Sequence, residues 1–324
     1  MTVQQEAIWT VILPDEILAS AGSWPRRWSL SKMIDRGGSR QLNSGRPYDV
    51  VGWAVTGHVA ATAAWAPAPV CWVADFSNEP PLGAMRIDPV HLAAGPRGLT
   101  LIPPGQLDIG EAEAQRLSGA LADALRDRAI GIRVGAPDRW YMSLGYAPDG
   151  PWRTPDDAAG RNLLECLPGG DDSAALRNLL NEIQMVLHQQ ADNEARRDRG
   201  RPEINSVWPW GWAQRPVPRV GSVVEQVYAE HPYALGLARL ADIPTRGAGV
   251  PEKDLPAAAA VVVPPTGRAA DPEWLETGWC RPLLRALARG RIQGVRLVSE
   301  SGRIFELSRK DRRRFWRRSR RSLG

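Results

Sequence analysis

Cysteine and histidine are scarce in this chain of 324 residues. Its three cysteines, Cys71, Cys166 and Cys280, lie far apart and form no CxxC pair, and only four histidines are present. This composition argues against a disulfide framework and against a structural zinc site. We therefore expect a protein of the reducing cytoplasm.

Long apolar runs are also missing. A membrane-spanning helix needs roughly 18 or more consecutive apolar residues. The most apolar stretch, residues 50–74, is interrupted by glycines and prolines, among them Gly52, Pro67 and Pro69. The first residues show no basic leader followed by an apolar segment, so we expect neither a membrane span nor secretion.

Positive charge is concentrated at the C-terminal end. Residues 309–321, RKDRRRFWRRSRR, carry a net charge of +8 in a chain of net charge +5, which leaves the remainder at about −3. Arginines around aromatic rings could neutralise phosphates while the rings stack on bases. A solvated arm whose aromatics pack on the body is the alternative. The tail residues predicted to contact nucleic acid or a partner are Arg312, Arg313, Arg314, Trp316, Arg317 and Arg318.

Apolar periodicity predicts an α/β fold, a mixed sheet with flanking helices. We expect strands at 7–14, 70–76 and 204–212, a hairpin over 292–308, and helices over 111–128, 173–199 and 281–289. Asp108 and Glu111 have the spacing of a capping box for the first of these helices. A stretch rich in Pro, Gly and Asp at 145–162 predicts an N-terminal half, 1–150, a C-terminal half, 151–308, and a basic tail, 309–324.

Tryptophan is abundant, with fourteen residues, and three of them alternate at Trp208, Trp210 and Trp212. In a regular strand this spacing puts all three indoles on one face. Such a wall could line a ligand pocket. It could equally be a packing layer beneath the long helix at 173–199.

A polar stripe accompanies the apolar face of the same long helix. Asn181, Gln184 and His188 recur at spacings of three and four residues, which places them on one side of a helix. If helix and following strand pack as neighbours, the stripe approaches Asn205 and Ser206. The stripe, these two residues and the indoles of Trp208 and Trp210 form the predicted ligand site. A satisfied hydrogen-bond network that docks helix on strand is the alternative.

Chemical motifs are sparse. The sequence contains no HExxH, GxSxG, Walker or GxGxxG motif. Asp88 and His91 are three residues apart, which is a weak metal signal. We therefore predict no cofactor and no metal, with Asp15, Asp88 and His91 as the weak alternative ligands.

One long segment resembles a known family. Residues 176–214 contain an N-E-I-Q-M-x-x-H helix followed by an A-R-x-x-R-G segment and an N-S-x-W strand. They resemble the bacterial RpfE-type regulatory proteins, whose members are often labelled phosphoglycerate mutases or cofactor-independent phosphoglycerate mutase-like proteins. The similarity extends to residues 89–92, 138–142, 230–241 and 313–318.

The resemblance implies a degenerate alkaline-phosphatase-like architecture. Cofactor-independent mutases of that superfamily use a Ser or Thr nucleophile and two metal ions held by Asp and His clusters. Asp15 stands where such enzymes place their first Asp ligand. The sequence VILPDE lacks the glycine that follows this Asp, and no later Asp-His pair or nucleophile motif is visible.

Three functional hypotheses remain open. The first is a regulatory or ligand-binding protein without conventional dinuclear-metal catalysis, with a small ligand or a protein as its partner. The second is an active phosphoglycerate mutase or other phosphotransferase that requires a divalent metal and uses Asp15, Asp75, Asp88, His91 and His188. The third is a nucleic-acid-associated accessory protein that acts through the basic tail.

Overall fold

The computed structural model divides the chain into two compact units. Unit 1 comprises Met1–Ala61 and Pro218–Gly324, and unit 2 comprises Thr62–Val217. The structure describes residues 7–42, 47–58, 66–95, 98–128, 130–146, 153–161, 163, 166, 173–214, 220–249, 255, 259–264 and 271–311. Within these residues, none of the helices has the length and apolar character needed to cross a membrane.

Unit 1 is built on a seven-stranded sheet of order β2-β12-β11-β1-β10-β8-β9. Strands β1, β8, β9, β10 and β11 run parallel, whereas β12 and β2 form an antiparallel edge. The bounds are β1 Ile8–Leu13, β2 Gly38–Gln41, β8 Gln226–Ala229, β9 Thr245–Arg246, β10 Ala260–Val263, β11 Gly294–Ser299 and β12 Arg303–Ser308. The central strands are almost wholly buried apolar runs, as expected for parallel strands covered on both faces.

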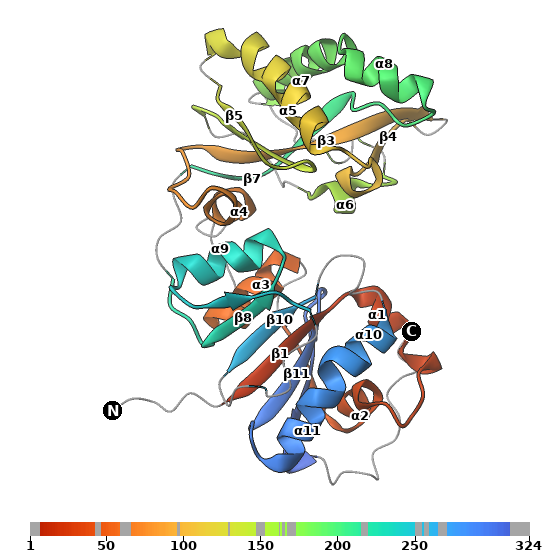
Figure 1. Ribbon diagram of the computed structural model, residues 1–324, viewed down its shortest axis with the longest axis vertical. Helices are drawn as coiled ribbons and strands as arrows, with labels where there is room; N and C mark the ends of the chain where they lie inside the picture. The colour runs from red at the N-terminus through yellow and green to blue at the C-terminus, as the bar shows by residue number, and fades with distance from the viewer. Residues whose placement is uncertain are drawn as a thin grey trace. The chain divides into compact units, whose positions relative to one another are not determined.

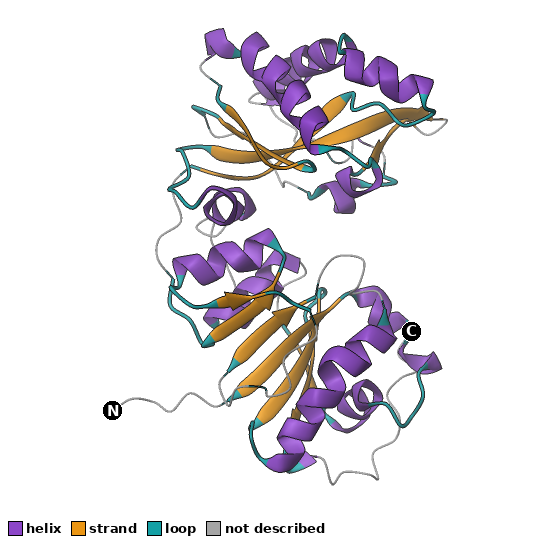
Figure 2. Cartoon of the chain, in the orientation of Figure 1, coloured by secondary structure: helices purple, strands orange, loops and turns teal. Residues whose placement is uncertain are grey.

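Helices cover both faces of the unit 1 sheet (Figure 2). On one face, side chains of α2, α11 and the π-helical turn η6 pack with Trp9, Tyr228 and Leu297 of the strands. Helix α9 packs on β8 and on α3. The bounds are α1 Asp15–Ala19, η1 Ala21–Ser23, α2 Ser29–Arg36, α3 Pro47–Thr56, α9 Pro232–Leu240, α10 Pro272–Leu275, η6 Glu276–Cys280 and α11 Arg281–Arg289. Gly290, in the left-handed region at φ 74°, ends α11 at residue 289, the predicted end of this helix.

Unit 2 contains a five-stranded antiparallel sheet whose long central strand, β3, pairs with β4, β6 and β7. Figure 1 shows α5, α7 and α8 on one face of this sheet and α4 on the other. The bounds are α4 Pro67–Phe76, β3 Ala84–Gly95, β4 Gly98–Ile102, η3 Pro104–Gln106, α5 Glu111–Ala124, η4 Arg126–Arg128, β5 Ile132–Ala136, β6 Arg139–Ser143, α6 Pro155–Ala158, α7 Ser173–His188, α8 Ala191–Asp198 and β7 Ser206–Ala213.

The predicted fold class, a mixed α/β fold with flanking helices, is confirmed, and the two compact units are divided at residues 61–62 and 217–218 rather than at 150. Strand β1 lies between β10 and β11, with Trp9 paired to Ala260 on one side and to Val295 on the other. The first strand therefore belongs to the same sheet as the last 100 or so residues. Unit 2 is an insertion between two parts of unit 1.

Two of the predicted elements differ in the structure. Residues 70–76, expected as a strand, belong to helix α4, which begins at Pro67 and ends before Ser77 in the left-handed conformation. The predicted helix over 173–199 is two helices, α7 and α8, separated at residues 189–190. In addition, α5 begins at Glu111 after Gly110, and Glu113 rather than Glu111 bonds back to the Gly110 amide.

Gly211 carries a bulge in β7. The β3–β7 register pairs Ala84 with Ala213 but Arg86 with Trp210, so β7 contains one extra residue. Gly211 has φ +67°, and a Cβ there would lie 3.0 Å from the Ala68 amide nitrogen of α4.

We expect Gly211→Ala to lower the free energy of unfolding by about 1–3 kcal/mol, because alanine is strained at this φ and meets the start of α4. Gly119→Ala is the matched control. Gly119 is exposed in the interior of α5 with nothing within 4 Å of a built Cβ, so this change should stabilise by about 0.5–1 kcal/mol. Urea denaturation of both variants checks the opposite signs, and equal signs would contradict the prediction.

Candidate functional site

The polar stripe predicted on the long helix does not face the strand. The apolar face of α7 is buried against the sheet as expected, with Leu176, Leu180, Ile183 and Leu187. The polar positions of the helix therefore face away from the sheet. Asn181 and His188 are exposed and Gln184 is half-buried. The expected convergence of this stripe with Asn205 and Ser206 is therefore wrong.

Asn205 bonds instead to the neighbouring strand. Its Oδ1 accepts from the Leu92 amide at 2.7 Å, and its Nδ2 donates to the Leu92 carbonyl at 2.9 Å. Ser206 is buried at the start of β7. The side chain of Asn205 thus continues the pairing with β3 one residue before the start of β7.

Asn193 of α8 supplies the helix-to-strand network that the sequence analysis ascribed to the polar stripe. This fully buried side chain donates to the carbonyls of Leu187, at 2.8 Å, and Ile204, at 2.9 Å, and accepts from the Ile204 amide at 2.8 Å. It therefore joins the end of α7 to the residues that precede β7. Sequence reasoning missed it because it lies in a strongly charged segment.

The tryptophans of β7 lie on two faces of the sheet. Trp208 and Trp210 pair with Asp88 and Arg86 of β3, whereas Trp212 packs on the opposite face with the core under α5 and α7. The expectation of one indole wall is therefore wrong for Trp212, because the bulge at Gly211 breaks the alternation. Trp208 donates its indole hydrogen to the Arg153 carbonyl at 2.9 Å.

A cluster of buried charged groups occupies the face of the sheet that α4 covers. Arg86 holds Asp88 by two hydrogen bonds, Nε to Oδ1 at 2.9 Å and Nη2 to Oδ2 at 2.6 Å. Trp210 donates its indole hydrogen to Asp88 Oδ2 at 2.7 Å, and its ring lies 4.5 Å from the Arg86 guanidinium carbon. Burial raises the pKa of Asp88 to about 6, against the lowering effect of Arg86 and Trp210.

A second carboxylate–arginine pair extends this cluster to α4 and β6. Asp75 accepts from Arg139 Nε at 2.7 Å and Nη2 at 2.8 Å, and from the Tyr141 hydroxyl at 2.5 Å. Cys71 lies beside Arg86, and burial raises the pKa of its thiol to about 11. Burial likewise raises the pKa of Tyr141. We call these residues the buried charged cluster: Cys71, Asp75, Arg86, Asp88, Arg139, Tyr141 and Trp210.

In the buried charged cluster, the bonds of Asp75 to Arg139 and Tyr141 join α4 to β6, and the bonds of Asp88 to Arg86 and Trp210 join β3 to β7. Each carboxylate receives two parallel bonds from one guanidinium, the strong geometry for such pairs. Sequence reasoning named Asp75 and Asp88 only as possible ligands. The signal it missed is the alternation in Met85, Arg86, Ile87 and Asp88, which sends two opposite charges to one strand face.

The other proposed metal ligands have protein partners of their own. Asp15 follows β1 in unit 1, and its Oδ1 accepts from the Ser301 hydroxyl at 2.9 Å. His91 is three residues from Asp88 on β3, so the two side chains extend to opposite faces of the strand. The His91 Nδ1 lies 2.8 Å from the Glu203 carbonyl oxygen. Across the described ranges, no three His, Cys, Asp or Glu side chains form a group able to hold a metal ion. The residues described therefore do not fit the dinuclear metal set that the resemblance implies.

The basic-tail residues Arg312, Arg313, Arg314, Trp316, Arg317 and Arg318 lie outside the described residues.

Comparison with curated proteins finds two mutases. The chain is 28% identical over 142 residues to a probable 2,3-bisphosphoglycerate-independent phosphoglycerate mutase of Geobacter sulfurreducens, a match covering 41% of this chain and 34% of that protein. It is 32% identical over 62 residues to the 2,3-bisphosphoglycerate-independent phosphoglycerate mutase of Methanosarcina barkeri, covering 19% and 16%. The match thus spans about a third or less of each relative's length. No protein-family model matches the chain.

A solved structure shares the fold over most of the chain. The PH0037 protein of Pyrococcus horikoshii has a TM-score of 0.53 at 11% identity, over 94% of this chain and 88% of that one. A cofactor-independent phosphoglycerate mutase of Thermoplasma acidophilum has a TM-score of 0.43 at 14% identity, over 94% and 90%. The chain is similar in sequence, over part of its length, to 2,3-bisphosphoglycerate-independent phosphoglycerate mutases.

Proposed function

We propose that this protein is a phosphoglycerate-mutase-like protein of the RpfE type that binds a ligand or a protein partner in a regulatory role. The similarity to mutases supports the first part of the proposal. The arginine pairs of Asp75 and Asp88 support the second part, a regulatory role in place of metal-dependent catalysis.

The bidentate engagement of Asp75 and Asp88 by arginines carries this proposal. Both carboxylates are buried, at 7% and 2% side-chain exposure, and each is held by a guanidinium at 2.6–2.9 Å. A carboxylate that neutralises a buried arginine would leave that cation uncompensated if it turned to a metal ion. In place of a catalytic role, Asp75 therefore serves the packing of α4 on β6, and Asp88 compensates Arg86 within the sheet.

Incubation of the full-length chain with 3-phosphoglycerate and added Mn²⁺ is expected to give no 2-phosphoglycerate. The reaction is followed by ³¹P NMR, with the Geobacter relative as a parallel sample. We also expect less than one equivalent of divalent metal after purification, measured by elemental analysis.

Metal-dependent turnover would overturn the proposal and support the alternative of an active phosphoglycerate mutase or other phosphotransferase. The position of Asp15, directly after β1 at the carboxyl end of the parallel strands, is the observation that favours this alternative. Its hydrogen bonds to Ser301 are exposed and easily exchanged.

Association with nucleic acid is a second candidate function. The net charge of +8 over residues 309–321 favours it, because counterion release from phosphates drives such binding and makes it fall steeply with salt.

A further inference from the structure

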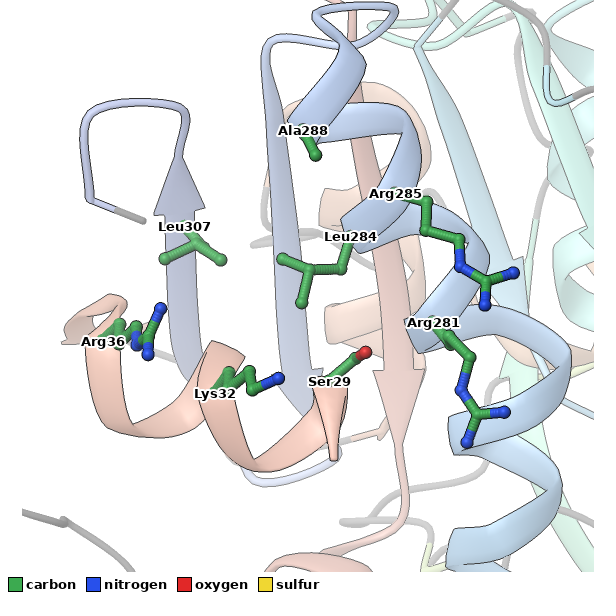
Figure 3. Close-up of a pocket in the computed structure, with 8 residues that line it drawn as sticks. All are labelled: Ser29, Lys32, Arg36, Arg281, Leu284, Arg285, Ala288 and Leu307. Atoms are coloured by element: carbon green, nitrogen blue, oxygen red, sulfur yellow. The ribbon is translucent and has the colours of Figure 1, made fainter. Parts of the chain in front are cut away.

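A basic groove lies between α2 and α11 in unit 1 (Figure 3). Its cavity has a volume of about 300 Å³, at the lower end of the range for small-molecule sites. Helix α2 contributes a hydroxyl and two cations, α11 contributes two more cations, and β12 contributes an apolar side chain. The lining residues are Ser29, Lys32, Arg36, Arg281, Leu284, Arg285, Ala288 and Leu307.

Four of these eight lining residues are cationic and none is acidic. Arg281 bonds Glu276 Oε1 at 3.3 Å, while Glu276 Oε2 accepts from the Leu30 amide at 2.9 Å. The Glu276 carboxylate thus compensates part of the charge of Arg281 at the N-terminal end of α11. Like charges that line one cavity repel one another, since screening acts over about 8–10 Å. A bound anion would lower the electrostatic energy of these cations.

We propose that this groove binds a small phosphorylated anion. Guanidinium groups match phosphate oxygens bidentately, and a lysine supplies a mobile point charge. The Ser29 hydroxyl adds a polar group, and Leu284, Ala288 and Leu307 give an apolar surface for an organic portion of the ligand.

The residues of the groove are separate from those of the buried charged cluster, the basic tail and the carboxyl end of the parallel strands. None of its lining residues follows a parallel strand, and none belongs to the buried charged cluster or to the basic tail. The inference therefore stands whether or not the chain turns over 3-phosphoglycerate.

The test is calorimetric titration of the full-length chain with inorganic pyrophosphate at 50 and 200 mM NaCl. We expect one site per chain, weakened at the higher salt. The double variant Lys32→Ala, Arg285→Ala should lose at least tenfold in affinity. The control Arg289→Ala, Arg303→Ala removes the same charge from exposed positions outside the groove and should change the affinity less than twofold.

Circular dichroism establishes that the variants are folded. If the double variant does not fold, Arg285→Gln, at an exposed position, replaces it, with an expected loss of about threefold in pyrophosphate affinity. Equal losses in the groove and control variants would overturn the proposal, because the pyrophosphate would then bind by general positive charge. Absence of pyrophosphate binding to the wild-type chain would also overturn it. A single-stranded oligonucleotide is titrated in parallel. If the groove variant binds this oligonucleotide more weakly but binds pyrophosphate as the wild type does, the proposal is also overturned, because the groove would then be a nucleic-acid surface.

Discussion

Asp88→Ala is expected to lower the free energy of unfolding by about 3–5 kcal/mol. The change leaves Arg86, whose side chain is 9% exposed, without the carboxylate that receives its two hydrogen bonds. It also removes the acceptor of the Trp210 indole hydrogen. An uncompensated charge and an unsatisfied donor then remain in the layer between α4 and the sheet.

Urea denaturation at pH 7.5 measures this loss, because Asp88, with a pKa of about 6, is ionised there. The control is Asp123→Ala, since Asp123 and Arg126 form an ion pair with exposures of 73% and 77%, and its loss should stay below about 1 kcal/mol. The double variant Arg86→Met, Asp88→Leu should be less destabilised than Asp88→Ala alone. A loss from Asp88→Ala no larger than that of the control would show that the pair does not anchor the fold.

The elements that local patterns define could be predicted from the sequence. Strand β1, helix α11 with its terminal Gly290, and the hairpin of β11 and β12 lie where periodicity and turn residues place them. Helix α4 was mistaken for a strand because residues 70–76, with six apolar residues and Asp75, are short and apolar enough to suit either structure. The four-residue spacing of Trp72 and Phe76, whose tilted rings have centroids 4.5 Å apart, was a helical signal within that segment.

The division of the chain could not be predicted, because it depends on pairing between distant segments. The apolar sequence of β1 predicts a buried strand, but it does not indicate which segments of the chain pair with it. Its pairing with β10 and β11 is determined by packing over about 250 residues. A loop rich in Pro and Gly at 145–162 suggested a boundary, but it lies within unit 2.

The candidate site was partly accessible from the sequence. Asp88 and Trp210 were singled out, yet for different roles, and the structure joins them through a hydrogen bond of 2.7 Å. The partners Arg86 and Arg139 were missed, because charged residues in a sequence are normally assigned to solvent. The polar stripe of α7 followed helical spacing correctly, but spacing alone does not tell which side of a helix meets the sheet.

Arg196→Met is expected to lower the free energy of unfolding by about 3 kcal/mol or more, because one buried guanidinium joins three segments of unit 2. Its side chain is 3% exposed and bonds both carboxylate oxygens of Glu113, at 2.6 and 2.9 Å. It also donates to the carbonyls of Leu107, at 2.9 Å, and Pro202, at 3.0 Å. Methionine fills a similar volume but leaves these acceptors unsatisfied.

Thermal and urea unfolding of Arg196→Met should be compared with Arg197→Met on the same helix. Arg197 is 43% exposed and pairs with Glu203 at 3.0 Å, so its loss should stay below about 1 kcal/mol. Arg196→Lys should fall between the two, since lysine keeps the charge but lacks the planar fork that reaches Glu113 and the carbonyls together. Equal losses for Arg196→Met and Arg197→Met would mean that α8 is held by its apolar contacts and by Asn193 rather than by this guanidinium.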